Sequence, residues 1–390
     1  MISVEEAIKI VKNSSVSREE IIVGVKDSLN FVLAESIYSP INIPSFQQSA
    51  MDGYAVCGEL NEFILKDEIQ AGDTRILRIT TGEACRIFTG APVPSGATAV
   101  IMQEKAENVD GKVSIHDDIV EGKNIRPIGE QIKATDLVFE KGQKLNPSAL
   151  GLLQGLGIKN VKVYKNPAIS LIVTGDELKP LDAQLNHGEI YESNSITLIS
   201  AAKQSGFIIG DFNHVVDNYE NTKNIISKQL DESDVLLLSG GISVGDYDFV
   251  KKALTENGVQ EIFYKVKQKP GKPLFFGKKD QKYVFALPGN PAAALTCYYI
   301  YVLPLLKKLK GERELCLESR TVQLDKPYLK KGNRAVFLKG YCTDDKVRIL
   351  DGQSSAMLHS YSLANCLIYI PENVFEISID DNVKIYRLPY

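Results

Sequence analysis

The middle of the chain alternates between short apolar runs and amphipathic segments. Helical spacing of apolar residues predicts helices at 194–206, 219–230 and 248–258, and a long helix from Asn290. The apolar runs predict strands at 168–174, 207–216, 234–239 and 261–266, and a hairpin of 274–277 with 283–287. Strands that alternate with helices predict an α/β domain with a mostly parallel sheet, over residues 166–311.

The pattern differs on both sides of this segment. Residues 3–13, 17–28 and 147–157 are predicted as helices, and residues 54–113 as short strands separated by Gly and Asp turns. Beyond residue 311 short strands return, at 334–338, 346–349, 366–370 and 383–388. The predicted division is a linker and helical domain (1–45 with 131–165), a β-rich domain (46–130), the α/β domain (166–311) and a small C-terminal β-barrel-like domain (312–390).

Composition narrows the class of function. The net charge of −4 over 390 residues gives no support for nucleic-acid binding. Six cysteines without a C-x-x-C pair, and four histidines, argue against a disulfide framework and a structural zinc site. The most apolar run, 292–306, is shorter than the roughly 20 residues of a membrane helix, and the first residues lack a signal-peptide pattern. We therefore expect a cytoplasmic protein without a membrane partner.

The strand at 234–239 leads into the most informative segment, a glycine turn before a helix. Such a turn brings main-chain N–H groups close to a ligand, and the following helix start favours anions. Two acids in the turn indicate that a divalent cation or the N–H groups of a heterocycle are bound as well. The candidate ligand-binding residues of this turn are Ser239, Gly240, Gly241, Ser243, Gly245, Asp246 and Asp248.

Three more loops of the α/β domain carry candidate chemistry. Thr174, Gly175, Asp176 and Glu177 end the first strand, as a metal or pterin-type site or as a solvated turn. Lys269 and Lys272 lie on a turn stiffened by two prolines, which suits a compact oxyanion, unless the turn is only an exposed basic loop. Pro288, Gly289 and Asn290 open the long helix as an anion site or as an ordinary cap. Outside the domain, Asp52, and Arg126 with Glu130, are either structural turns or a second constellation.

Eight segments in order resemble the molybdopterin molybdenumtransferase family, the MoeA type, which includes the E domain of gephyrin. The segments are SAMDGYAV, TGAPVPSGATAVIMQE, NIRPIGEQ, TGDEL, IYESNS, SGGISVGDYD, KPGKPLFFG and LPGNPAAAL. They span nearly the whole chain, so the resemblance implies the full multi-domain fold. The α/β domain is also similar to the molybdopterin adenylyltransferases (MogA-like), which lack the flanking parts.

The resemblance implies that adenylylated molybdopterin is cleaved to release AMP and that molybdate enters the dithiolene, with Mg²⁺ as helper ion. It implies catalytic roles for Asp52, Arg126, Glu130, Glu177, Asp217 and Asp248, of which Glu177, Asp217 and Asp248 would hold the metal. Molybdate would be held by Lys269, Lys272, Arg334 and Ser355 (or its neighbour Ser354). It further implies a homodimer, with clefts shared between two chains, and suggests a molybdopterin adenylyltransferase as partner.

Two departures from the family pattern keep alternatives open. Gln131 stands where the family has an acid, and no serine occurs in Pro291–Ala293, where members often have one. A molybdopterin-binding scaffold protein is therefore weighed beside the molybdenum-inserting enzyme. A tungstate-inserting enzyme is weighed as well, because molybdate and tungstate are nearly equal in size and charge. An adenylyltransferase is disfavoured by the N-terminal and C-terminal β domains.

Overall fold

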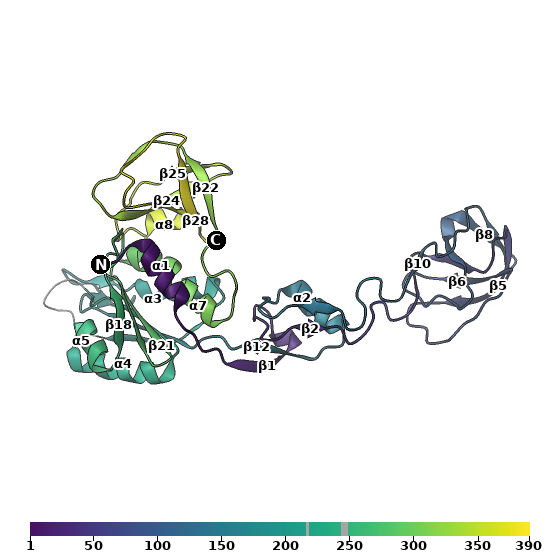
Figure 1. Ribbon diagram of the computed structural model, residues 1–390, viewed down its shortest axis with the longest axis horizontal. Helices are drawn as coiled ribbons and strands as arrows, with labels where there is room; N and C mark the ends of the chain where they lie inside the picture. The colour runs from purple at the N-terminus through teal and green to yellow at the C-terminus, as the bar shows by residue number, and fades with distance from the viewer. Residues whose placement is uncertain (216–217, 243–248) are drawn as a thin grey trace.

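The computed structural model describes residues 1–215, 218–242 and 249–390. The chain is elongated, with a β unit at one end, a narrow middle segment, and the α/β part with the C-terminal barrel at the other end (Figure 1). The predictions for Asp217, Ser243, Gly245, Asp246 and Asp248 concern positions outside the described residues. The predicted domain boundaries stay a prediction, which the separate sheets support.

A six-stranded sheet in the order β16-β13-β17-β21-β20-β18 forms the centre of the α/β part. Its strands are β13 (Ile169–Thr174), β16 (Ile209–Val215), β17 (Val235–Ser239), β18 (Gln260–Tyr264), β20 (Phe275–Lys279) and β21 (Lys282–Leu287). The first four strands in that order are parallel, whereas β20 and β18 pair antiparallel. The mostly apolar sequences of β13 and β17 match their complete burial between two helical layers. The prediction of a mostly parallel α/β sheet is confirmed.

Helices cover both faces of this sheet. The helices α4 (Tyr219–Glu232) and α5 (Phe249–Glu256) pack on one face. On the other face lie α3 (Asn194–Gln204) and the run of α6 (Pro291–Cys297), the π-helical turn η3 (Tyr298–Val302) and α7 (Leu303–Leu309). The amphipathic α1 (Val4–Asn13) packs against this run, although it begins the chain (Figure 1).

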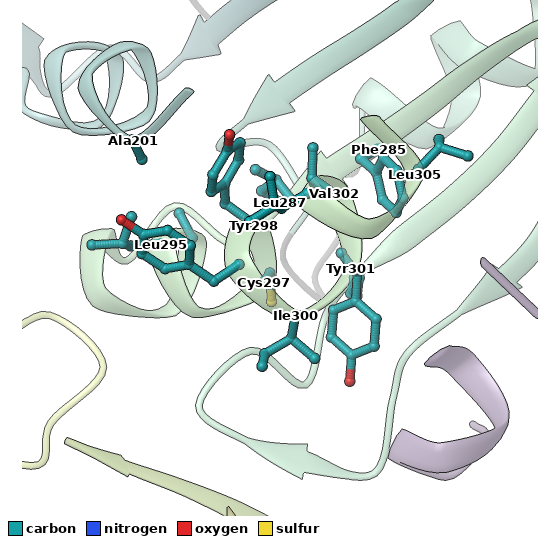
Figure 2. Close-up of a cluster of buried hydrophobic side chains, with 14 of the residues drawn as sticks. Ala201, Phe285, Leu287, Leu295, Cys297, Tyr298, Ile300, Tyr301, Val302 and Leu305 are labelled. Atoms are coloured by element: carbon teal, nitrogen blue, oxygen red, sulfur yellow. The ribbon is translucent and has the colours of Figure 1, made fainter. Parts of the chain in front are cut away.

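The long helix predicted from Asn290 is interrupted by the π-helical turn. Pro304 has no N–H for the carbonyl of Ile300, four residues earlier, and this missing bond accounts for the changed winding. Figure 2 shows side chains of this run, among them Tyr298 and Tyr301, buried against the sheet. By length and composition Pro291–Leu309 could cross a membrane, but 89% of the apolar window is buried in the protein, as in a core helix.

The predicted helix at 17–28 is wrong. Residues Glu20–Gly24 form β1, which pairs antiparallel with β12 (Asn160–Tyr164), and Val25–Asp27 form the short η1. Three consecutive β-branched residues, Ile21, Ile22 and Val23, favour the extended conformation over a helix. The helix predicted at 147–157 is confirmed as α2 (Pro147–Gly155), which Asn146 caps. The pair β2 (Ile37–Tyr38) and β11 (Leu137–Phe139) completes this middle segment.

Two further β units lie at the two ends of the chain's elongated shape (Figure 1). The one at the end away from the α/β part is called the distal β unit. Its sheet has the order β7-β4-β6-β5-β9-β8, and beside it β3 (Gln48–Ser49) pairs with β10 (Ile125–Arg126). Its elements are β4 (Gly53–Val56), β5 (Glu62–Ile69), β6 (Glu83–Ile87), β7 (Ala99–Met102), η2 (Gln103–Lys105), β8 (Ala106–Val109) and β9 (Lys112–Ile115).

The C-terminal strands close into a barrel, because β24 pairs with both β25 and β26 while β22 and β28 complete the ring. These strands are β22 (Ser319–Leu324), β24 (Ala335–Cys342), β25 (Lys346–Ile349), β26 (Cys366–Ile370) and β28 (Asn382–Arg387). Short elements complete the chain: β14 (Leu178–Lys179), β15 (Ile190–Tyr191), β19 (Gln268–Lys269), β23 (Tyr328–Leu329), α8 (His359–Ser362) and β27 (Glu376–Ile377). The predicted small barrel-like domain is confirmed.

Candidate functional site

A cavity of about 540 Å³ lies at the carboxyl ends of β13, β17 and β21. The chain runs from β13 outward to β16 and returns to β17 on the other side of β13. Thr174 ends β13 and Ser239 ends β17. These two residues therefore flank the topological switch point of the sheet. Open α/β sheets bind ligands at this place. The cavity is lined by residues from all four loops that the sequence singles out, with Pro273 as the contribution of the lysine turn, and its size suits a small organic ligand.

The glycine turn forms one wall of this cavity. Gly240 and Gly241 have φ angles of +98° and +64°, which L side chains rarely adopt. A Cβ atom on Gly240 would lie 2.2 Å from the carbonyl oxygen of Thr174, and one on Gly241 would lie 2.6 Å from Cγ2 of Val250. The turn therefore requires glycine at both positions, and β17 leaves the sheet in close contact with the end of β13.

The loop after β13 faces this turn. Gly175 has a φ of +150°, and the Glu177 carboxylate folds over it, with Oε2 2.8 Å from the position that a Cβ would occupy. Asp176 and Glu177 are both exposed, but only Glu177 lines the cavity, and the Asp176 carbonyl accepts a hydrogen bond from Lys179. The Thr174 hydroxyl is buried and has no hydrogen-bond partner in the described part of the chain. Glu177 thus offers a carboxylate to a ligand, whereas the buried Thr174 hydroxyl packs against the glycine turn.

Asn194 joins three loops at the base of the cavity, and the sequence did not single it out as a site residue. It is 8% exposed, and its Nδ2 donates to Ser239 Oγ at 2.8 Å and to the Gly289 carbonyl at 2.7 Å. Asn194 is the first residue of α3 and belongs to the segment IYESNS, so this motif is the sequence feature that could have identified it as a site residue. Asn194 positions the ends of β17 and β21 relative to each other.

We expect Asn194→Leu to lower the stability of the protein by about 1–3 kcal/mol, because Ser239 Oγ and the Gly289 carbonyl each lose a donor. It should also weaken ligand binding in the cavity. Thermal unfolding and binding titrations measure the two effects. Asn257→Leu is the matched control, since Asn257 Nδ2 also donates to two acceptors, the carbonyls of Lys223 and Ala253. Equal loss of binding in both variants would contradict a local role for Asn194.

The start of α6 is held by the C-terminal part of the chain. Asn290 Nδ2 donates to Ser355 Oγ at 2.9 Å, and the Ala293 N–H donates to the Ser355 carbonyl at 3.1 Å. The helix start is therefore less open than the sequence suggests, because Ser355 already uses one of its N–H groups. Pro288, Gly289 and Asn290 all line the cavity, and Ala356 lines it from the C-terminal side.

The lysine turn lies beside the cavity, and its conformation depends on Gln268. The buried Gln268 side chain donates to the Gly271 carbonyl at 3.2 Å and accepts from the Tyr301 hydroxyl, on the π-helical turn (Figure 2). A Cβ on Gly271 would lie 2.6 Å from Cys297 Sγ, so the turn packs closely on α6. Burial raises the pKa of the Cys297 thiol to about 12, which keeps it neutral.

Both lysines of the turn are exposed. Arg334 Nη1 donates to the Gln268 carbonyl at 3.4 Å, which brings the guanidinium to the same turn. Lys269 lines a second cavity, of about 250 Å³, together with Tyr328 and Gln353 of the C-terminal part, while Pro273 lines the main cavity. The structure thus places the lysine turn between the two cavities, with Arg334 beside it.

Asp52 is held by the loop that follows β6 in the distal β unit. Its Oδ1 accepts from the main-chain N–H and from the hydroxyl of Thr89, both at 2.7 Å. The Thr89 N–H, followed by the Thr89 hydroxyl and the nearby charge of Arg86, holds the pKa of Asp52 below its usual value. The Arg86 guanidinium is itself fixed, since it donates to the Gly53 carbonyl and stacks on Tyr54. Asp52 is therefore ionised and rigidly placed.

Arg126 and Glu130 are exposed near the same end of the distal β unit. Arg126, in β10, pairs with Gln48, in β3. The strand β3 ends only a few residues before Asp52 in the chain, so Arg126 is tied to the segment that carries Asp52. In one chain this unit lies at the opposite end of the molecule from the α/β part (Figure 1). The fold of a single chain therefore does not bring Asp52, Arg126 and Glu130 to the cavity.

Metal ligands are few in the described part of the site. Among residues 1–215, 218–242 and 249–390, no three His, Cys, Asp or Glu side chains form a group that could hold a metal ion. Glu177 is one carboxylate at the cavity, and Glu192 accepts from the N–H of Ser195 at 2.8 Å. One or two carboxylates with substrate phosphates are enough for Mg²⁺, so the described donors are compatible with that ion.

The chain matches three family models. Residues 2–157 match the MoeA N-terminal region (domains I and II), residues 170–308 match a probable molybdopterin-binding domain, and residues 321–388 match the MoeA C-terminal region (domain IV). The second match covers almost all of the sheet and every residue that lines the cavity except Ala356. Fold and site thus define a multi-domain protein with a molybdopterin-binding α/β domain.

Relatives of known name extend over almost the whole chain. A molybdopterin molybdenumtransferase of Haemophilus influenzae is 34% identical over 93% of this chain and 92% of its own. A protein of the same name from Staphylococcus epidermidis is 36% identical over 80% of this chain and 77% of its own. The crystal structure of the molybdopterin biosynthesis MoeA protein from Pyrococcus horikosii is 28% identical, has a TM-score of 0.83, and is matched over 100% of this chain and 99% of its own. The chain belongs to the molybdopterin molybdenumtransferase family, as the sequence motifs predicted.

Proposed function

We propose that this protein is a molybdopterin molybdenumtransferase, which cleaves adenylylated molybdopterin, inserts molybdate into the dithiolene and releases AMP. The observation that carries the proposal is the glycine-walled cavity at the switch point of the sheet. It occurs in a chain that is 30–36% identical to proteins of this name. The roles of the individual candidate site residues belong to the same proposal.

Different residues at the cavity suit different parts of the two substrates. The main chain at Gly240 and Gly241 lines the cavity, where it can approach a phosphate group. The Glu177 carboxylate can accept hydrogen bonds from the N–H groups of a pterin ring. Lys269, Lys272 and Arg334 carry positive charge beside the cavity, where a small dianion such as molybdate would be attracted. Asn290 and Ser355 supply an amide and a hydroxyl at the start of α6.

Mg²⁺ belongs to the proposal as a helper ion. Glu177 would hold it, together with Asp217 and Asp248, which lie outside the described residues. When bound, the ion would neutralise charge on the phosphate oxygens of the substrate. The position and geometry of Glu177 over Gly175 leave its carboxylate facing the cavity, as such a role requires.

We further propose a cytoplasmic homodimer. Asp52, Arg126 and Glu130 lie at one end of an elongated chain and the cavity lies at the other, so a second chain is the simplest source of these residues for each cavity (Figure 1). A molybdopterin adenylyltransferase is proposed as partner, since an enzyme of that class produces the adenylylated substrate.

A binding and scaffold role is the second candidate, and Gln131 favours it. An amide carries no charge and is a poorer ligand for Mg²⁺ than the acid that the family has at this position. Gln131 is exposed and follows Glu130 directly, so the neighbouring carboxylate remains available. A preference for tungstate is compatible with the same residues, because the two oxyanions have nearly equal size and charge.

Incubation with adenylylated molybdopterin, Mg²⁺ and either molybdate or tungstate tests the proposal. We expect release of AMP and formation of cofactor, with a preference for one oxyanion. Binding of the substrate without AMP release would instead support the scaffold role, and no binding at all would overturn both.

Lys272→Ala is expected to weaken molybdate binding about 10- to 150-fold, the loss of one charged hydrogen bond, and to leave molybdopterin binding nearly unchanged. Isothermal titration with molybdate measures this effect. Lys228→Ala removes an exposed lysine of α4, on the opposite face of the sheet, and is the control. Unchanged molybdate affinity in Lys272→Ala would remove this lysine from the oxyanion site.

A further inference from the structure

Lys339 is a buried cation of the C-terminal barrel that lies outside the set of candidate site residues. It belongs to β24 and is 4% exposed. Its Nζ donates to the carbonyls of Gly352 at 2.7 Å, Ser354 at 3.1 Å and Met357 at 3.1 Å. An ammonium group has three donors, so a single segment, 352–357, uses all of them.

A second set of hydrogen bonds ties the same segment to β24. The Lys339 main-chain N–H donates to Gln353 Oε1 at 2.9 Å, and Gln353 Nε2 donates to the Lys339 carbonyl at 2.9 Å and to the Leu350 carbonyl at 2.7 Å. Ser360 Oγ donates to the Gly352 carbonyl at 2.6 Å. The segment 352–357 is therefore fixed to the barrel on its inner side.

The outer side of this segment meets the cavity. The N–H and C=O of a trans peptide point in opposite directions, so the Ser355 N–H points away from Lys339 while the Ser354 carbonyl faces it. Ser355 contacts Asn290 and Ala293 at the start of α6, and Ala356 lines the cavity. Carbonyl oxygens that face Lys339 cannot face a bound anion, which they would repel.

Burying a charged lysine side chain inside the barrel costs free energy, so a lysine is expected at this position only if its charge has a role. Burial lowers the pKa of Lys339, since the apolar barrel disfavours its charged form. Lys330 repeats the arrangement in the segment that carries Arg334, because its Nζ donates to the carbonyls of Arg334, Pro371 and Glu372. Both C-terminal candidates for the oxyanion site, Arg334 and Ser355, thus lie on segments that a buried lysine holds.

We propose that Lys339 is a positioning residue of the oxyanion site, which holds the segment 352–357 so that Ser355 stays at the start of α6. The role of Ser355 toward molybdate rests on the proposed function, whereas the effect of Lys339 on the segment does not. The two can therefore fail separately.

The experiment compares Lys339→Met, Ser355→Ala and the double variant with the unchanged protein. Molybdate affinity is measured by calorimetry, and hydrogen exchange of 350–358 by mass spectrometry. Lys310→Met is the control, because Lys310 is equally buried and donates to the Gly206 carbonyl, away from the cavity. We expect Lys339→Met to speed exchange in 350–358 and to weaken molybdate binding about tenfold. Molybdopterin binding should change little.

The double variant shows whether Lys339→Met weakens molybdate binding by displacing Ser355 or by destabilising the protein in general. If Lys339 acts through Ser355, adding Ser355→Ala to Lys339→Met should cause little further loss of molybdate affinity. With Lys310→Met the losses should simply add. Full additivity with Lys339→Met, or unchanged exchange in 350–358, would overturn the proposal.

Two other results are equally decisive. If Lys339→Met does not fold, Gln353→Met loosens the same segment and must show the same exchange and affinity changes, or the proposal fails. If the unchanged protein does not bind molybdate, the proposed function fails. In that case exchange in 350–358 alone decides whether Lys339 holds the segment.

Discussion

Gly240→Ala is expected to abolish molybdopterin binding. An alanine Cβ would lie 2.2 Å from the Thr174 carbonyl oxygen, and the φ of +98° adds a backbone penalty of about 1–2 kcal/mol. The main chain at the end of β17 would have to move, and it forms a wall of the cavity. We expect affinity for molybdopterin to fall at least about 100-fold, the equivalent of roughly 2.7 kcal/mol. A fluorescence or calorimetric titration with molybdopterin measures this loss.

Two controls separate the clash from its side effects. Gly72→Ala carries a similar positive φ, +86°, but a Cβ there meets nothing within 4 Å, in a turn of the distal β unit. It should lose stability without losing binding. Gly289→Ala adds a methyl group to the cavity wall with only an ordinary contact, 3.6 Å from Gly240 Cα. Normal binding by a folded Gly240→Ala variant would mean that the turn has no part in the site.

The sequence predicted this part of the molecule well because its signals are local. An apolar run followed by Ser239, Gly240 and Gly241 predicts a buried strand and then a sharp glycine turn; the strand is confirmed, and both glycines have positive φ angles. The alternation of strands and helices similarly predicted the central sheet. The wrong helix at 17–28 shows the limit of periodicity, because a β-branched run over Ile21–Val23 outweighed it once β12 offered a pairing partner.

Contacts between segments that are far apart in the chain could not be predicted from the sequence. Asn194 lies 45 residues before Ser239 and 95 before Gly289, and only the fold shows that one amide joins all three. Lys339 looks like any exposed strand lysine until the barrel closes around it. The sequence also did not show that Ser355 would occupy an N–H at the start of α6. These residues act through tertiary hydrogen bonds, which leave no periodic or compositional trace.

Mixed dimers should recover activity that neither parent variant shows. Asp52→Ala changes the distal β unit and Glu177→Ala changes the cavity, and each is expected to be inactive alone. If each cavity is completed by the other chain, a heterodimer has one cavity with both residues intact. Random pairing makes half of the dimers mixed, so the unseparated mixture should show about a quarter of the normal activity, and mixed dimers isolated from it about half. AMP release from adenylylated molybdopterin, in dimers purified with two different affinity tags, measures the recovery.

The tagged heterodimers also identify the alternative arrangement. If Asp52 reached the cavity of its own chain, every cavity in a mixed dimer would carry one of the two substitutions, and no activity would return. Asp52→Ala paired with Arg126→Ala is the matched control, because both residues lie in the same distal unit and would serve the same cavity. In that mixture each cavity lacks one residue in either arrangement, so it should stay inactive. Recovery there, or a monomeric mass in solution, would contradict the shared-cavity model.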